Sequence, residues 1–387
     1  MVDPRIDLVE RARKLGPSLA ERAERIEESR TLPDDVVADL READLFRLFV
    51  PESLGGPEAN VINGMEAIAE VARHEGSSAW CVMIAGTTSL LAGFLTDEHA
   101  RVIFGPPDSC TGGLAAPVGT AREADGGLLV TGTWAWGSGT RHCTFVGGGV
   151  RLVDESGERQ PRNDGLTAPF VFMDPTDVEF VDTWHVTGLA GSGSGDYTVT
   201  EAFVPEGRWV QLATTSPVLD GPLWQFPFYG MLAAGVASVS IGLLDGAIDR
   251  FVEVAGSKRP QGSTRLLAER PAAQAGLSAA EATARSARAF LADTLGVAWD
   301  TAASGDPLST EQRRSIRLAA ADAAQRCADA LVGLQRQAGG TAVYLREPLQ
   351  RTVRDGQVAA THAMVADRIH ELTGRLRLGL DTDTGLL

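Results

Sequence analysis

RDGQVAATH, residues 354–362, is the stretch of the chain on which the prediction of the fold depends most. It lies in a long helical pattern behind a Gly339-Gly340 break, and it combines an Arg354-Asp355 pair with His362, eight positions after the arginine. Histidine is the side chain most easily tuned to exchange a proton near neutral pH. Only six histidines occur in 387 residues, so His362 is a candidate catalytic group. The alternative is a structural histidine satisfied by a carbonyl across a helical bundle.

The composition is that of an ordinary globular protein, with 44% apolar and 22% charged residues. The net charge of −16 argues against nucleic acid as a partner, because phosphate binding needs a basic face. The four cysteines have no metal-ligand spacing, which indicates reduced thiols and no bound metal. Residues 1–30 lack the apolar core of a signal peptide. The uncharged stretch 221–244 fits a buried helix that starts after Pro227 better than a membrane span. We therefore expect a soluble, cytoplasmic protein.

Three regions follow one another along the chain. Residues 1–109 have helical periodicity, and residues 110–216 contain short β-rich runs separated by glycines, which predict a compact antiparallel sheet. Residues 217–387 hold four long segments rich in Ala and Leu (223–251, 268–299, 310–337 and 348–377), enough for a four-helix bundle. The expected fold is α+β: an N-terminal helical domain, a central antiparallel β domain and a C-terminal four-helix bundle.

This order, with several motifs, resembles the acyl-CoA dehydrogenase superfamily over nearly the whole chain. The motifs are LFRLFVPESLGG at 45–56, GTWAWGSGTRHCTFVGGG at 132–149, TGLAGSGSGDYTVTEAFVP at 187–205, QAGG at 337–340 and the Arg354-Asp355 helix. Each motif alone is unspecific, but five in the family's order are not. Within the superfamily the chain resembles the flavin-dependent monooxygenases.

The resemblance also shows where the chain departs from the dehydrogenases. Most of those enzymes carry a glutamate base soon after the Arg-Asp pair, and here that place holds Thr361, His362, Ala363 and Met364. Others carry the base on the first helix of the bundle, and residues 221–244 contain no acid. A histidine at this place is typical of two-component monooxygenases, in which a separate reductase supplies reduced flavin that forms a C4a-hydroperoxide. By this resemblance His362 acts as a base toward a substrate hydroxyl or as a donor to the peroxide.

The WGSG turn, residues 136–139, is the second part of the expected site. In the relatives a serine of this motif hydrogen-bonds flavin N5, which makes Ser138 the equivalent here. Gly137 and Gly139 would let a flat ring approach the backbone; the alternative is a strand-end turn in which Ser138 bonds only local backbone. Trp134 and Trp136 lie two apart and should share one face of a strand, either walling the flavin or filling the core.

Further cofactor contacts are implied by the resemblance. Ser192, Gly193 and Ser194 could offer hydroxyls and amides to flavin oxygen or phosphate. Arg259, beside Lys258, could reach the flavin phosphate of a neighbouring subunit or simply face solvent. The QAGG motif adds Gln337, Gly339 and Gly340 to the expected cofactor residues. FAD-using dehydrogenases carry a glutamine three residues before the double glycine, where this chain has Arg336, so FMN is slightly favoured over FAD.

The prediction is therefore an oxygenase component that uses reduced FMN or FAD from a separate flavin reductase to hydroxylate a small organic substrate. The relatives' homotetramer, packed through the C-terminal bundle, is expected here as well. The substrate need not be a phenol, because residues 82–88 lack the histidine that binds phenols in the hydroxylases. The alternatives are a flavin oxidase or dehydrogenase with His362 as base, and a descendant that has lost redox activity.

Overall fold

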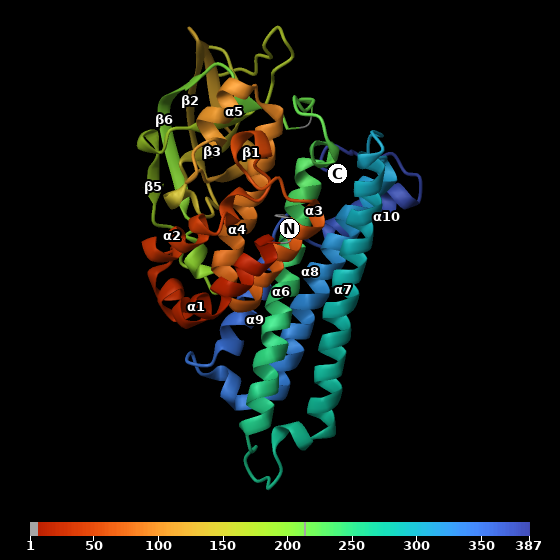
Figure 1. Ribbon diagram of the computed structural model, residues 1–387. Helices are drawn as coiled ribbons and strands as arrows, with labels where there is room; N and C mark the ends of the chain where they lie inside the picture. Colours follow the sequence, from red (N-terminus) through yellow and green to blue (C-terminus); the bar gives the residue numbers. More distant parts are fainter. Residues whose placement is uncertain (1–6, 213) are drawn as a thin grey trace.

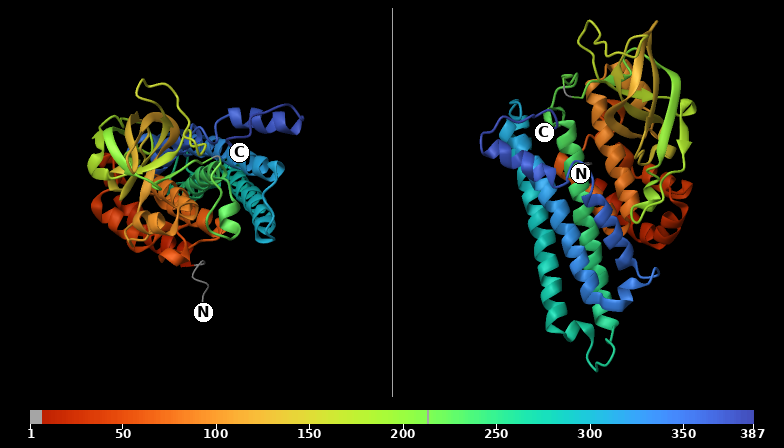
Figure 2. Two further views of the ribbon diagram at one scale, coloured as in Figure 1. Left: turned by 90° about the horizontal axis from the view of Figure 1, so that it is seen from above. Right: turned by 180° about the vertical axis from the view of Figure 1, so that it is seen from behind.

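The computed structural model describes residues 7–212 and 214–387. Figure 1 shows three parts: a sheet at one end, short helices beside it, and long helices that run past both. The view from behind in Figure 2 shows the same long helices side by side, with their connection 258–270 at the tip that projects farthest from the sheet. The predicted fold class is confirmed, with two differences of detail that affect the site.

The N-terminal part contains five helices. They are α1 (Asp7–Ser29), α2 (Asp34–Glu42), α3 (Val61–His74), α4 (Gly76–Ser89) and α5 (Asp97–Phe104). Helix α4 is buried at nearly every position, and the Glu75 carboxylate caps it by accepting from the backbone N–H groups of Ser77 and Ser78. A carboxylate at a helix N-terminus satisfies N–H groups that have no intrahelical partner. Packed against both the sheet and the bundle, α4 is the element that connects the three regions.

The sheet has seven strands in the order β5-β6-β2-β1-β3-β4-β7. They are β1 (Thr111–Ala124), β2 (Gly127–Trp134), β3 (Phe145–Leu152), β4 (Phe170–Met173), β5 (Glu179–Val181), β6 (Asp196–Pro205) and β7 (Trp209–Val210). The expected antiparallel sheet is in fact mixed, because β1 and β3 pair in parallel. Strand β1 was not among the predicted β-rich runs, because its sequence, TGGLAAPVGTAREA, lacks the β-branched alternation that marks a strand.

The bundle consists of α6 (Phe228–Ser257), α7 (Pro271–Ala303), α8 (Thr310–Ala338) and α9 (Pro348–Ala360), followed by the short α10 (Arg368–Arg377). Helix α6 starts directly after Pro227, as predicted, and α9 packs on both α6 and α8. The fourth segment is not one helix over 348–377, because α9 ends at Ala360 and the chain turns before α10 begins. His362 therefore lies in this break, not in a helix.

Two helical segments, residues 76–94 and 228–257, are long and apolar enough to cross a membrane by length and composition alone. Their most apolar windows are 89% and 78% buried inside the protein. Burial against other protein elements is what a core helix requires, and both segments pack here as core helices.

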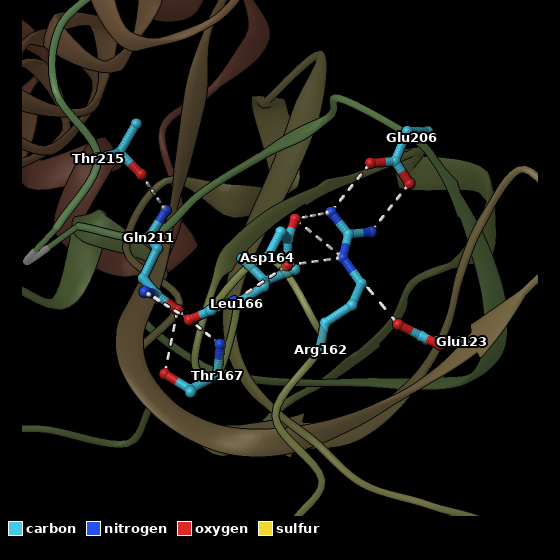
Figure 3. Close-up of polar contacts among 9 residues, drawn as sticks. Glu123, Arg162, Asp164, Leu166, Thr167, Glu206, Gln211 and Thr215 are labelled. Atoms are coloured by element: carbon cyan, nitrogen blue, oxygen red, sulfur yellow. Dashed lines mark hydrogen bonds and ion pairs between the residues drawn. The ribbon is translucent and has the colours of Figure 1, made fainter.

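The long loop between β3 and β4 is held by polar contacts at the outer end of the sheet (Figure 3). The Arg162 guanidinium contacts both Asp164 and Glu206, and the Gln211 side chain accepts from the backbone N–H of Thr167. Exposed pairs of this kind contribute little stability each, about 0–1 kcal/mol. They fix the loop, and none of these residues reaches the site described next.

Candidate functional site

His362 follows the C-terminal end of α9, where its ring meets α4. The ring lies edge-on to Trp80 of α4, with 5.5 Å between the ring centroids. Its Nδ1 accepts a hydrogen bond from the backbone N–H of Met364 at 3.3 Å. Burial, with smaller contributions from Arg317 and Arg368, lowers the pKa of His362 to about 4. The imidazole is therefore neutral at pH 7, and because Nδ1 accepts, its proton is on Nε2.

Arg317 of α8 holds this turn through hydrogen bonds to its backbone. Its side chain is fully buried and donates to the backbone carbonyls of Met364, at 3.1 Å, and Leu386. Burial lowers the pKa of Arg317 to about 10. Met364 thus links the two side chains: its carbonyl accepts a hydrogen bond from Arg317, and its N–H donates one to His362. The buried cation keeps the ring in place and opposes protonation of the imidazole.

Ser138 also contacts Trp80. The indole Nε1–H of Trp80 donates to Ser138 Oγ at 3.0 Å, and Ser138 Oγ is 2.7 Å from Ser194 Oγ. Ser194 Oγ is in turn 2.7 Å from Ser192 Oγ, which donates to the carbonyl of Leu189 at 2.6 Å. All three serines are buried. Trp80 therefore touches both predicted catalytic residues, with Ser138 at its N–H and His362 at its edge.

The Arg354-Asp355 pair holds the loop that contains these serines. The Asp355 Oδ1 accepts from the backbone N–H of Leu189 at 2.6 Å, and Arg354 donates to the carbonyl of Thr187 at 2.5 Å. Leu189 has a left-handed backbone, φ 53°, which costs a non-glycine residue free energy unless its surroundings hold it. The motif that indicated the fold thus acts on residues 187–194, far away in sequence.

The Asp355 carboxyl leads to a prediction about how the free energy of unfolding depends on pH. Its carboxyl is fully buried beside Glu75, and burial raises its pKa to about 7. The folded protein then keeps a proton that the unfolded chain loses near pH 4, so this group makes the free energy of unfolding fall as the pH rises from about 4 to 7. Asp355→Asn keeps an acceptor for Leu189 and should remove that slope, up to about 1.4 kcal/mol per pH unit.

Urea unfolding at several pH values measures this slope. The burial of Glu75 also raises its pKa, so Glu75 adds a slope that remains in the Asp355→Asn variant. The difference between wild type and variant isolates Asp355. Equal slopes would show that Asp355 is ionised in the folded protein throughout this range.

The WGSG turn is joined to the serine loop by backbone hydrogen bonds. The N–H of Gly137 donates to the carbonyl of Gly195 at 2.9 Å, and that of Gly139 to Ser192 at 3.0 Å. Gly139 has φ 68°, which favours glycine, whereas a Cβ on Gly137 would lie 2.7 Å from the Tyr197 ring. Gly139 is therefore required by the backbone of the turn, and Gly137 by its packing against Tyr197. Both requirements hold whether or not a flat ring approaches the turn.

The expectation that Trp134 and Trp136 share a strand face is wrong. Strand β2 ends at Trp134, whose ring is fully buried and stacks on Tyr197. Trp136 has φ 56°, which ends the strand alternation, and its side chain is 65% exposed. Trp134 therefore fills the core, and Trp136 is the one of the two available to a ligand.

The predicted site residues fall into two groups. Trp136, Gly137, Ser138, Gly139, Ser192, Gly193, Ser194 and His362 come together around Trp80. Arg259, Gln337, Gly339 and Gly340 lie where α6 and α8 end, at the other end of the bundle (Figure 1). There Lys258 donates to the carbonyl of Ala338. Arg259 and both glycines are exposed there. Within one chain, the two groups do not form one site.

A reduced flavin edge fits the first group. Ser138 retains acceptor capacity after its contacts with Trp80 and Ser194, the neutral His362 offers Nε2–H, and the exposed Trp136 ring stands beside the turn. Ser192 and Ser194 use their hydroxyls within the protein, so they are not free to bind a flavin phosphate as predicted. Among residues 7–212 and 214–387 no group of three potential metal ligands occurs.

A cavity with a volume of about 590 Å³ lies at the N-terminal end of α6. Aromatic rings, including Phe94, Phe228 and Tyr229, line it together with Leu387 at the C-terminal end of the chain. Arg313, one helical turn before Arg317 on α8, also borders it. This cavity adjoins the elements of the site but includes neither Ser138 nor His362.

Sequence reasoning missed Trp80 and Arg317. Trp80 lies in an apolar run in which every position reads as core, and Arg317 is one of many arginines on an amphipathic helix. A buried cation in the last third of the chain has no local sequence signature. Only the long-range contacts reveal these roles.

The chain was compared with known proteins. A family model described as acyl-CoA dehydrogenase, N-terminal domain, matches residues 7–101, and one described as acyl-CoA dehydrogenase, C-terminal domain, matches residues 234–367. A pigment production hydroxylase of Rhodococcus sp. is 32% identical over 99% of both chains. The flavin-dependent monooxygenase oxygenase subunit HsaA of Rhodococcus jostii is 28% identical over 97% of this chain and 100% of its own. The structure of XiaF from Streptomyces sp. in complex with FADH2 and glycerol superposes with a TM-score of 0.89 at 27% identity, covering 97% of this chain and 96% of XiaF.

Proposed function

The chain belongs to the acyl-CoA dehydrogenase superfamily and is the oxygenase component of a flavin-dependent monooxygenase, and on this premise we propose that Ser138 and His362 form its catalytic pair. The observation that carries the proposal is that Trp80 contacts both residues, which brings them to one place from positions 138 and 362. Bound reduced flavin supplies the activation of O2, from which one oxygen atom passes to the substrate. The protein's residues orient the reactants and control protons.

His362 acts as a hydrogen-bond donor. The neutral ring, with Nδ1 committed to Met364, presents Nε2–H toward the space beside Trp80. A general base would need a free ring nitrogen, and the free one carries the proton. Of the two roles that the sequence leaves open, the geometry supports the donor role, in which Nε2–H gives a hydrogen bond to the oxygen being transferred or to the product oxygen.

Dehydrogenation of an acyl thioester is not supported. It requires a carboxylate base at the reacting carbon, and the positions that hold it in the dehydrogenases are filled by other residue types. The carboxyl of the Arg-Asp motif, Asp355, is fully buried and holds the N–H of Leu189. Asp355 is therefore part of the scaffold.

Stopped-flow absorbance tests the proposed function. We expect the protein with reduced FMN or FAD, mixed with oxygenated buffer, to give a lasting band near ~380 nm before oxidised flavin appears. The band should be shortened in Ser138→Ala. Conversion to oxidised flavin at the rate of free flavin would contradict the proposal. A protein that purifies yellow and is bleached anaerobically by a substrate would instead be an oxidase or dehydrogenase.

We also propose FMN ahead of FAD, with a separate reductase as the source of the reduced form. Arg336 is exposed and stands where FAD-using relatives carry a glutamine, which removes one contact to the adenine end. The second group, Arg259 with Gln337, Gly339 and Gly340, could then meet only the flavin of another copy. A homotetramer packed through the bundle, located in the cytoplasm, is the expected form.

The Arg259→Ala variant tests whether the cofactor is FMN or FAD. If FMN is the cofactor and Arg259 faces solvent, this variant should bind reduced FMN within about twofold of wild type, since no charged contact is lost. Loss of about tenfold or more in the affinity for reduced FAD, with FAD preferred in wild type, would assign FAD and an intersubunit contact. Sedimentation of both proteins shows whether the assembly is unchanged.

A planar aromatic molecule is the proposed substrate class. Trp80 and the exposed Trp136 flank the Ser138 turn, and the nearby 590 Å³ cavity is lined by aromatic rings. Aromatic rings pack well against one another in offset or edge-on arrangements.

A further inference from the structure

The hydroxyl groups beside Trp80 form a chain whose hydrogens can be counted. The contact between Ser192 Oγ and the Leu189 carbonyl is 2.6 Å, and a carbonyl cannot donate, so the single hydrogen of Ser192 lies in this bond. Ser194 must then donate to Ser192, because the Ser192 hydrogen is already used. By the same count Ser138 donates to Ser194. Ser138 therefore donates to Ser194, Ser194 to Ser192, and Ser192 to the Leu189 carbonyl.

The direction of the hydrogen bonds in this serine chain cannot reverse without a cost in free energy. If Ser192 turned its hydrogen to Ser194, two acceptor oxygens would face each other at 2.6 Å without a hydrogen between them. The Leu189 carbonyl is held where it is, since it also accepts from Trp184 Nε1 at 3.1 Å and its N–H is bound by Asp355. The direction is thus fixed by buried contacts outside the chain itself.

This direction decides what Ser138 can do. Its only hydrogen goes to Ser194 and one lone pair accepts from Trp80, which leaves one lone pair and no donor. Ser138 is 6% exposed, so little water is present to compensate a mismatched partner. A ligand atom at this oxygen should therefore carry a hydrogen.

We propose that Ser192 and Ser194 make Ser138 an obligate acceptor and thereby make the site selective for reduced over oxidised flavin. The inference rests on the proposed function, in which Ser138 lies at flavin N5. Reduced flavin has a hydrogen on N5 and can donate to Ser138. Oxidised flavin has only a lone pair there, which would face the lone pair of Ser138 in a buried place. Ser192 and Ser194 are positioning residues, since they act through Ser138.

The selectivity suits an oxygenase component that takes its flavin from another protein. The reduced form must bind before O2 reacts, and the oxidised form must leave after each turnover. A site that stabilises both forms equally would be occupied by spent flavin. The serine chain provides the difference in affinity without any movement of the backbone.

The experiment measures dissociation constants for reduced flavin, under anaerobic conditions, and for oxidised flavin, using FMN and FAD with the full-length protein. Ser194→Ala frees the Ser138 hydrogen, so Ser138 can donate to oxidised N5. Ser192→Ala should act in the same way although Ser192 does not touch Ser138, because it lets Ser194 reverse and donate to Ser138. We expect each variant to bind oxidised flavin about tenfold more tightly and reduced flavin within about twofold of wild type.

Ser240→Ala is the matched control. Ser240 is buried on α6 and its hydroxyl donates to the carbonyl of Val236, outside the serine chain, so the ratio of the two constants should stay at the wild-type value. Circular dichroism verifies folding, and if Ser194→Ala does not fold, Ser192→Ala carries the test. Unchanged ratios in both Ser192→Ala and Ser194→Ala would overturn the inference and leave the proposed function standing. A wild-type protein that binds neither form of flavin would overturn the proposed function itself.

Discussion

Replacement of His362 by alanine should lower product formation by about a hundredfold to a thousandfold, the usual contribution of one positioned hydrogen-bond donor. Reduced-flavin affinity should change little, because Ser138 and its hydrogen bonds to Trp80 and Ser194 remain intact. Steady-state product analysis with a reductase, together with anaerobic flavin titration, separates the two effects. His370→Ala, an exposed histidine on α10, is the matched control and should retain full activity.

His362→Gln tests whether His362 acts as a hydrogen-bond donor. A glutamine amide can accept from Met364 through its oxygen and donate through its nitrogen, which reproduces the hydrogen-bond polarity of the neutral ring. It should recover part of the activity that alanine loses. Native product formation by His362→Ala would show that the reaction does not use this side chain.

The pH dependence of the wild type follows from the pKa of about 4 for His362. Product formation should show no titration of this group between pH 6 and 8, since the ring is neutral throughout. The unfolded chain titrates near ~6.5, so the unfolded state binds more protons between about pH 4 and 6.5. His362 therefore makes the free energy of unfolding rise with pH in that window, and the rise should be absent in His362→Ala.

Replacement of Trp80 by alanine should have the largest combined effect on stability and activity. Trp80 is buried, and removal of a buried aromatic side chain costs about 3–5 kcal/mol. The same change removes the contact that positions His362 and the donor to Ser138. Urea unfolding should show the loss of stability, and product formation should fall even at temperatures where the variant is folded.

Phe251→Ala provides the matched comparison for Trp80. Phe251 is a fully buried aromatic residue of α6 that borders neither the cavity nor the serine chain. It should lose comparable stability and keep a normal fraction of substrate hydroxylated per flavin oxidised when assayed well below its melting temperature. If both variants lose this coupling equally, the effect of Trp80 is general destabilisation and not the positioning of Ser138 and His362.

The order of elements was predictable because it is written in local periodicity. Helical spacing, the change to β-rich runs after Cys110 and the start of a helix after Pro227 each depend on neighbours in sequence. The break after Ala360 was not predictable in this way, since residues 361–367 contain no glycine or proline to end a helix. Strand β1 was missed for the opposite reason, because its position is fixed by pairing with β2 and β3.

The sequence by itself determined which residue types were available for the reaction: a histidine where the dehydrogenases have a glutamate, and a serine between two glycines. Tertiary structure alone decided the protonation of the histidine and the hydrogen-bond direction of the serine. It placed Trp80 between them, turned three serine hydroxyls toward Leu189, and gave His362 its neutral Nε2–H form through Met364 and the buried Arg317. The proton on a side chain depends on its partners and its burial, and these come from residues that the sequence separates by tens to hundreds of positions.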